Sequence, residues 1–136
     1  MSSFTLSFLA ADQPFYTGEC ISLVVPTVEG QYGILAHHSN TIAAVVPGLL
    51  TFTLPSGETR TAAVSEGMVK IENNEVLILV DSAERPEDID ISRARRAADE
   101  AREQILQKKS IMEYRSAHAY LARALNRIKI GTDRKR

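Results

Sequence analysis

The first 82 residues alternate between apolar and polar positions with a period of two, which predicts β-strands. Leu6 and Phe8 alternate with the polar residues Thr5 and Ser7, and the run 21–25 is mostly apolar and rich in β-branched side chains. Several further short apolar runs follow at close spacing up to residue 82. A series of short strands of this kind predicts an antiparallel β-sandwich of about eight to ten strands.

Two pairs of these runs are joined by turn residues. The runs 49–54 and 58–64 flank Pro55-Ser56-Gly57, and the runs 68–72 and 75–80 flank Asn73-Asn74. Glycine and asparagine tolerate the positive φ that hairpin turns demand. Both pairs are therefore expected to form β-hairpins.

After Asp90 the apolar period becomes helical, and two amphipathic helices are expected. Ser110 and Glu113 have the spacing of a capping box, which predicts the start of the second helix, and Gly131 stands where a left-handed C-terminal residue is expected. The helices form a hairpin whose alanines permit close approach but bury little area, so its closure is expected to be weak. The apolar stripes are Ala94, Ala97, Ala98, Ala101 and Ile105 on the first helix, and Tyr114, Ala117, Leu121, Ala124, Leu125 and Ile128 on the second.

Charge divides the chain at the same place as the period. Residues 1–85 carry 9 acidic and 3 basic side chains, whereas residues 86–136 carry 8 acidic and 13 basic ones. The division falls at Arg85-Pro86, where proline would also end a strand. Two modules are therefore predicted, a sandwich over 1–85 and a helical hairpin over 86–136.

Several classes of protein are disfavoured by the sequence. The longest apolar stretch, 41–54, is broken by Pro47-Gly48 and is too short to span a membrane, and the first residues lack the features of a signal peptide. The single Cys20 has no partner for a disulfide or a redox pair. No nucleophile elbow, Walker loop or zinc-protease motif is present, and the glycines at 30 and 33 fit a tight loop between strands better than a nucleotide loop. We therefore expect a protein that is not an enzyme, and no metal or required cofactor.

Two groups of polar residues are candidates for binding. His37 and His38 follow Tyr32 in a predicted exposed loop, where a protein contact and plain solvent exposure are both open and a metal site is disfavoured. Arg123 and Arg127 share one helix face. They could grip phosphate while the segment holding Glu84, Asp90 and Arg93 completes a nucleotide site. Spacing alone favours structural roles for this second group, such as a helix cap for Asp90. Nucleic acid is disfavoured because the basic residues are interleaved with acidic ones and no aromatic row accompanies them.

A series of motifs resembles the epsilon subunit of F-type ATP synthases. The motifs occur in order along the chain, and they are Gly30-Gln31-Tyr32-Gly33-Ile34-Leu35-Ala36-His37-His38, Val46-Pro47-Gly48, Val64-Ser65-Glu66-Gly67-Met68-Val69, Ala83-Glu84-Arg85 with Asp88-Ile89-Asp90, and Arg123-Ala124-Leu125-Asn126-Arg127. That family has an N-terminal β-sandwich and a C-terminal helical hairpin. The resemblance thus implies the same division that the periodicity and the charge predict.

The resemblance also implies a function. The chain would be a subunit of the central stalk whose sandwich binds the gamma subunit and the ring of c subunits, with Gln31, Tyr32, His37 and His38 in the contact loop. It would couple proton flow to ATP synthesis without catalysing it, on the cytoplasmic face of the bacterial cell membrane and held there only through the complex. The hairpin, extended toward the catalytic alpha and beta subunits, would inhibit ATP hydrolysis.

The segment 89–94 resembles the ATP-sensing motif of bacterial epsilon subunits. The resemblance implies that ATP, as a regulatory ligand that is not hydrolysed, would hold the hairpin folded. A free-standing nucleotide-sensing module is the alternative function. The implied ATP-binding residues are Glu84, Ile89, Asp90, Arg93, Ala94, Arg123 and Arg127.

Overall fold

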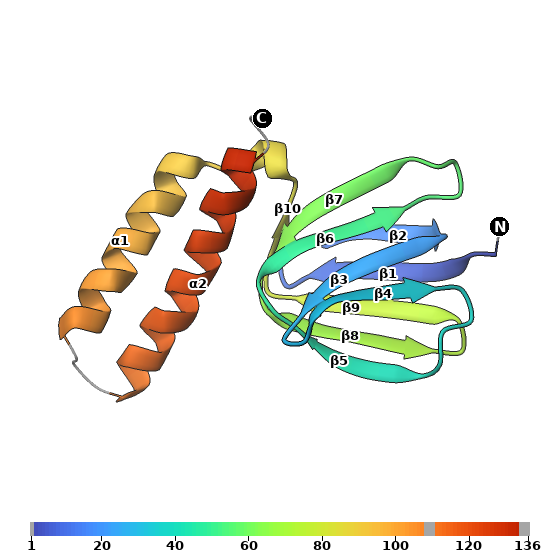
Figure 1. Ribbon diagram of the computed structural model, residues 1–136, viewed down its shortest axis with the longest axis horizontal. Coiled ribbons are helices and arrows are strands. Elements are labelled where there is room, and N and C mark those ends of the chain that lie inside the picture. The colour runs from blue at the N-terminus through green and yellow to red at the C-terminus, as the bar shows by residue number, and fades with distance from the viewer. Residues whose placement is uncertain (1, 108–110, 134–136) are drawn as a thin grey trace. The chain divides into compact units, whose positions relative to one another are not determined.

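The computed structural model describes residues 2–107 and 111–133 (Figure 1). The chain forms two compact units, Met1–Glu84 and Arg85–Arg136, each with its own internal packing. The first unit consists of strands and the second of helices, as the change of period predicts. The predicted helix cap at Ser110 lies outside the described residues.

The strands of the first unit form one continuous hydrogen-bonded sheet. Its order is β10-β7-β6-β3-β5-β8-β9-β1-β2, and β4 pairs with β3. The strands are β1 (Phe4–Ala10), β2 (Pro14–Cys20), β3 (Ser22–Thr27), β4 (Gly30–Leu35), β5 (Thr41–Val45), β6 (Gly48–Thr53), β7 (Thr59–Val64), β8 (Gly67–Glu72), β9 (Glu75–Val80) and β10 (Ala83–Glu84).

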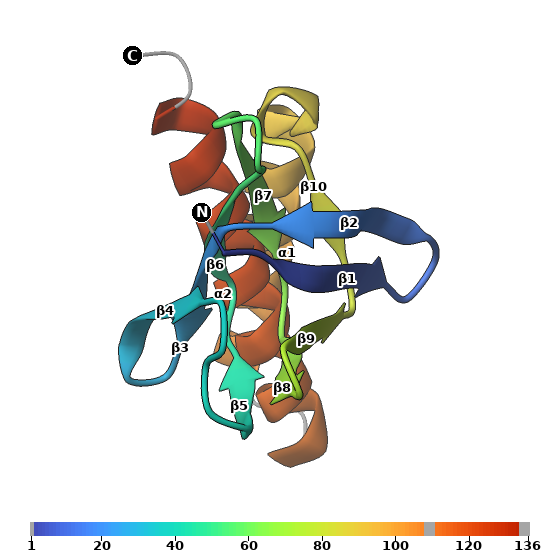
Figure 2. The same cartoon turned by 90° about the vertical axis from the view of Figure 1, so that its right-hand side faces the viewer.

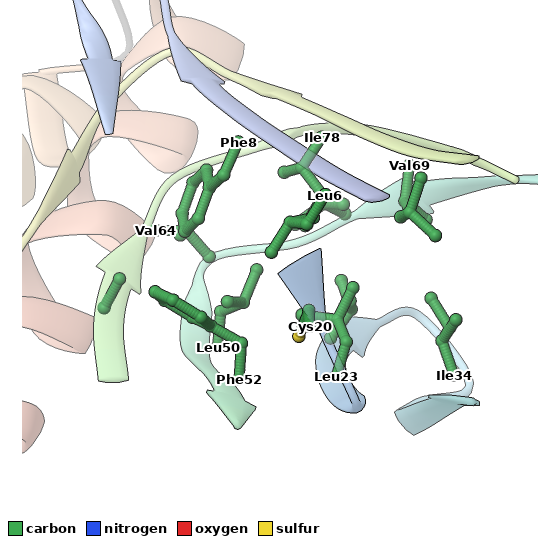
Figure 3. Close-up of a cluster of buried hydrophobic side chains, with 14 of the residues drawn as sticks. Leu6, Phe8, Cys20, Leu23, Ile34, Leu50, Phe52, Val64, Val69 and Ile78 are labelled. Carbon is green, nitrogen blue, oxygen red and sulfur yellow. The ribbon is translucent and has the colours of Figure 1, made fainter. Parts of the chain in front are cut away.

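The sheet folds over itself into two layers, which confirms the predicted sandwich. Phe8 on β1 and Phe52 on β6 are far apart in the strand order, yet their ring centroids are 6.1 Å apart in an edge-to-face arrangement. Figure 3 shows Leu6, Phe8 and Ile78 facing side chains of β3 and β6 across this core. The alternation of apolar residues along the strands places them there, because successive side chains point to opposite faces.

One pairing differs from the expectation of an antiparallel sandwich. β1 and β9 run parallel, with Leu6 opposite Val76 and Phe8 opposite Ile78, whereas the other pairs in the described chain are antiparallel. Antiparallel pairing follows from short hairpin connections. The long segment between β1 and β9 imposes no such constraint, so local pattern could not reveal their direction.

The two predicted hairpins are present, as β6–β7 and β8–β9. Asn73 and Asn74 have φ of 51° and 62°, the two positive values that a tight hairpin turn requires.

The prediction of a loop at residues 30–33 is wrong, because these residues belong to β4. β4 pairs with β3 from Gly30 opposite Thr27 to Leu35 opposite Ser22, in the hairpin seen at the lower left of Figure 2. The turn precedes Gly30, whose φ of 111° starts the returning strand. Glycine therefore marks the end of the turn, and Gly33 is accommodated within the strand.

The second unit contains a short 3₁₀ turn, η1 (Pro86–Asp88), and two helices, α1 (Ile91–Gln107) and α2 (Ile111–Asp133), which run side by side and antiparallel (Figure 1). The seam between the helices is built from small side chains: Ala94, Ala98 and Ala101 are fully buried, and Ala117 and Ala124 nearly so. The described part of the chain has no helix long and apolar enough to cross a membrane.

Two residues of α2 differ from the sequence prediction. Leu125 is 40% exposed, because the buried positions Ala117, Ala124 and Gly131 recur every seven residues and Leu125 lies one position further round the helix. Gly131 is not a left-handed cap but a buried helical residue, since α2 continues to Asp133. A Cβ atom there would lie 2.9 Å from Ile91 Cγ1 and 3.3 Å from Ile89 Cγ2. Glycine therefore serves close packing at this end of the hairpin.

Candidate functional sites

Of the residues in the predicted contact loop, Gln31 and Tyr32 lie on β4, and His37 and His38 lie in the loop between β4 and β5. Both ring nitrogens of His38 have a polar partner. His38 Nδ1 is 2.8 Å from the Ser39 carbonyl oxygen, and His38 Nε2 is 3.0 Å from the Tyr32 hydroxyl. A carbonyl oxygen only accepts, so Nδ1 carries a proton and donates to Ser39, and in the neutral form of the ring Nε2 accepts from the Tyr32 hydroxyl. The two rings also meet edge to face, with centroids 5.5 Å apart. Tyr32 and His38 thus form a half-buried polar pair, not two independent exposed side chains.

The same loop is tied to the β8–β9 turn. His37 has φ of 64°, and its backbone N–H donates to Asn74 Oδ1 at 2.7 Å. Asn40 Oδ1 accepts from the Asn73 N–H at 3.1 Å. The sequence indicated Asn74 only as a turn residue and did not indicate Asn40, because local periodicity carries no signal for contacts between segments so far apart.

The surface beside this loop is apolar in part. Gln31 is exposed on the outward face of β4, as is Leu35 at 64%. Ile42, at the start of β5, is 69% exposed. Large apolar side chains left this exposed are typical of protein contact surfaces when they gather. The sequence contained a signal for Ile42: Val45 points into the core, so strand alternation places Ile42 outward.

In the part of the chain that the structure describes, no group of three or more His, Cys, Asp and Glu side chains could hold a metal ion. Cys20 is fully buried, and its thiol lies within hydrogen-bond distance of the carbonyl oxygens of Ser22 and Thr53. Burial raises the pKa of this thiol above its ordinary value. The buried thiol thus has the character of a core side chain and not of a reactive one.

Four of the residues implied in ATP binding lie at the N-terminus of α1. Asp90 caps the helix, because its Oδ1 accepts from the Arg93 N–H at 3.0 Å. The Asp90 side chain and the Arg93 guanidinium are exposed, whereas Ile89 and Ala94 are buried packing residues. The structural role that spacing favoured for Asp90, a cap at the helix N-terminus, is therefore present.

Arg123 and Arg127 lie one turn apart on α2 and are both half-buried. The Arg123 guanidinium stands 6.0 Å from the centre of the Tyr120 ring. Because the helices are antiparallel and Gly131 meets Ile91, these arginines lie toward the end of the hairpin that holds the α1 N-terminus. Glu84 belongs to the other unit, where it lies on the short strand β10 opposite Ala63 of β7.

Both units have recognisable counterparts among known proteins. Residues 3–86 match the family described as "ATP synthase, Delta/Epsilon chain, beta-sandwich domain", and residues 87–131 match "ATP synthase, Delta/Epsilon chain, long alpha-helix domain". The ATP synthase epsilon chain of Ruminiclostridium cellulolyticum is 39% identical over 136 residues, which is the full length of both chains. The chain belongs to the epsilon-chain family of ATP synthases. The epsilon chain of Caldanaerobacter subterraneus subsp. tengcongensis is 37% identical over 130 residues, covering 96% of this chain and 94% of the relative.

The fold of the family recurs in distant solved structures. A chain in the mitochondrial ATP synthase of Euglena gracilis, solved with its OSCP, F1 and c-ring, has a TM-score of 0.77 at 22% identity and covers 93% of this chain and 79% of its own length. A chain in the central stalk and c-ring of the Tetrahymena thermophila enzyme has a TM-score of 0.61 at 12% identity, covering 97% and 96%. The resemblance stated from the sequence motifs is therefore confirmed, and the chain is an epsilon subunit of the F-type ATP synthase central stalk.

Proposed function

We propose that this epsilon subunit is a non-catalytic coupling and regulatory subunit. Its sandwich binds the gamma subunit and the ring of c subunits, and so helps to couple proton flow to ATP synthesis in the catalytic head. The loop surface formed by Gln31, Tyr32, His37 and His38 makes the contact with these partners. The subunit is peripheral, on the cytoplasmic face of the bacterial cell membrane, and is held there through the complex.

The observation that carries the regulatory part of this proposal is the small-residue seam of the hairpin. The two helices pack against each other, and Ala94, Ala98 and Ala101 of α1 and Ala117 and Ala124 of α2 all have almost no exposure. Burial stabilises by about 25 cal/mol per Å² of apolar area, so alanine contributes much less than leucine at each position. The helices can approach closely but gain little free energy from doing so. Such an element opens at low cost, as a switch requires.

Charge suits the opened hairpin to inhibition. Residues 86–136 carry 13 basic and 8 acidic side chains. An extended hairpin of this charge is attracted to acidic surface on the catalytic alpha and beta subunits. In that position it blocks the rotation that accompanies ATP hydrolysis and acts as a brake.

ATP regulates the brake by binding to the folded hairpin. Arg93, Arg123 and Arg127 supply charged partners for phosphate oxygens, and the ligand shifts the population toward the conformer that it prefers. The variants Arg93→Ala and Arg127→Ala are each expected to weaken ATP binding by well over about tenfold in calorimetry. Arg95→Ala is the matched control, because Arg95 is an exposed arginine of α1 outside this set. Equal affinities in all four proteins would rule out the site.

Gel filtration with a cognate gamma subunit tests the assignment to the rotor. We expect the full chain and gamma to elute together as a stable complex. If the chain binds ATP tightly but never associates with gamma, the alternative of a free-standing nucleotide-sensing module is favoured instead.

A further inference from the structure

Three segments distant in sequence meet at one end of the sandwich. The β4–β5 loop, the β8–β9 turn and the start of β1 all lie at the right-hand end in Figure 1. Asn74 bonds to both of the other segments. Its Oδ1 accepts from the His37 N–H at 2.7 Å, and its Nδ2 donates to the Ser3 carbonyl oxygen at 3.0 Å.

The turn position that Asn74 occupies does not by itself call for this side chain. Its φ is 62°, and glycine is the residue that adopts such a value most readily at the second position of a tight hairpin turn. Asparagine tolerates this backbone and adds one acceptor and one donor. Both are used on other segments, so the side chain links parts of the sandwich end and does not stabilise only its own turn.

In the β4–β5 loop, the residue that Asn74 holds has a strained backbone. His37 has φ of 64°, a value that costs a residue with a Cβ about 1 kcal/mol or more unless surrounding contacts impose it. The bond to Asn74 is made by the N–H of His37 itself. A second tie, from the Asn73 N–H to Asn40 Oδ1, holds the other end of the loop. His38 lies between the two ties.

We propose that Asn74 is a positioning residue that sets the geometry of the Tyr32–His38 pair through His37, and thereby the shape of the contact surface. This inference rests on the proposed function, in which that surface meets the c-ring. Holding His37 in the left-handed conformation directs the following residue toward Tyr32 on one side and toward the Ser39 carbonyl on the other. The ring is thereby kept with its proton on Nδ1, and the surface is preorganised before it meets its partner.

Asn74→Gly tests the proposal in the full-length chain. Glycine suits the turn, so the variant is expected to fold while losing both side-chain bonds. Asn73→Gly is the matched control, because Asn73 reaches Asn40 through its backbone N–H, which glycine retains. Asn74→Asp is the conservative variant, since it keeps an acceptor for the His37 N–H and removes the donor to Ser3.

Two readouts report on the loop directly. We expect the His37 amide of Asn74→Gly to exchange with solvent roughly tenfold faster than in the unmodified chain. Nitrogen-15 spectra of the imidazole should show His38 passing from the Nδ1–H form to a mixture of the two neutral forms. Asn74→Asp should retain the His37 protection, and Asn73→Gly should change neither readout.

A third readout reports on function, namely binding to the detergent-solubilised cognate c-ring. Asn74→Gly is expected to bind roughly tenfold more weakly, and Asn73→Gly like the unmodified chain. The proposal is overturned if Asn74→Gly leaves the His37 exchange and the His38 proton position unchanged, or if it loosens the loop and still binds with full affinity. Failure of the unmodified chain to bind the ring would overturn the proposed contact itself. The exchange and nitrogen-15 results would then still decide whether Asn74 holds the loop.

Discussion

Gly131 offers the sharpest test of how the hairpin closes. A Cβ atom on this residue would lie 2.9 Å from Ile91 Cγ1, roughly 0.6 Å inside the ~3.5 Å at which carbon atoms make favourable contact. Overpacking of this kind costs about 1–3 kcal/mol, whereas alanine in place of glycine inside a helix gains at most about 1 kcal/mol. We therefore expect Gly131→Ala to destabilise the hairpin by about 1 kcal/mol, and the larger Gly131→Asn by about 2–3 kcal/mol.

Urea unfolding followed by far-ultraviolet circular dichroism measures this change, because the helices of the chain belong to the hairpin unit. Thr132→Ala is the control, since Thr132 is exposed and its replacement gains helix propensity without a new contact. The order of the two Gly131 variants is decisive. At a left-handed helix cap asparagine would be tolerated better than alanine. If Gly131→Asn is the more stable variant, or if Gly131→Ala stabilises the hairpin, the close-packing account is refuted.

Three further predictions follow from single contacts. Asp90→Ala should lower the stability of the hairpin by about 1 kcal/mol in the same assay, because the cap on the Arg93 N–H is lost. Asparagine also caps helices, so Asp90→Asn should cost less, and equal costs for the two variants would contradict capping. Gly67→Ala should lower the thermal stability of the sandwich by at least about 2 kcal/mol, because the new Cβ would overlap Leu79 O and lie 2.7 Å from Val80 Cα, both in the backbone of β9. Burial raises the pKa of the Cys20 thiol, so the unfolded chain loses this proton at a lower pH than the folded chain. The free energy of unfolding should therefore be constant with respect to this group below pH ~8.5 and fall as the pH rises further. Urea midpoints that fall equally with pH in the unmodified chain and in Cys20→Ala would contradict this.

The features that the sequence predicted correctly are those with a local cause. Asn73 and Asn74 tolerate the positive φ of a tight turn, and apolar runs flank them on both sides, which together predict the β8–β9 hairpin. The change from a period of two to a helical period separates the strands from the helices. Ala94, Ala98 and Ala101 mark the buried side of α1 because their spacing matches the helical repeat.

The features that the sequence left unpredicted depend on contacts across the fold. Nothing near Leu6 or Ile78 indicates that β1 and β9 run parallel. Gly131 has the local character of a helix cap, and only its contact with Ile89 and Ile91 on another element explains why it is helical and buried. The bond between Asn74 and His37 is likewise visible only once the two segments are placed together.

The candidate sites follow the same rule. The position of Asp90 before a helical run was enough to predict its cap on α1. The pairing of Tyr32 with His38 required the strand that carries Tyr32 to be placed first, because residues 30–33 had the composition of a loop.

The account depends most on the claim that the sandwich couples and the hairpin inhibits. The direct measurement is the ATPase rate of a cognate catalytic head that contains gamma, titrated with the full chain and with a chain truncated after Asp88. The truncated chain keeps the whole sandwich unit, whose core is its own. We predict that both proteins bind and that only the full chain lowers the rate, with relief at high ATP concentration. Equal rates with the two bound proteins would contradict the claim that the hairpin is the brake.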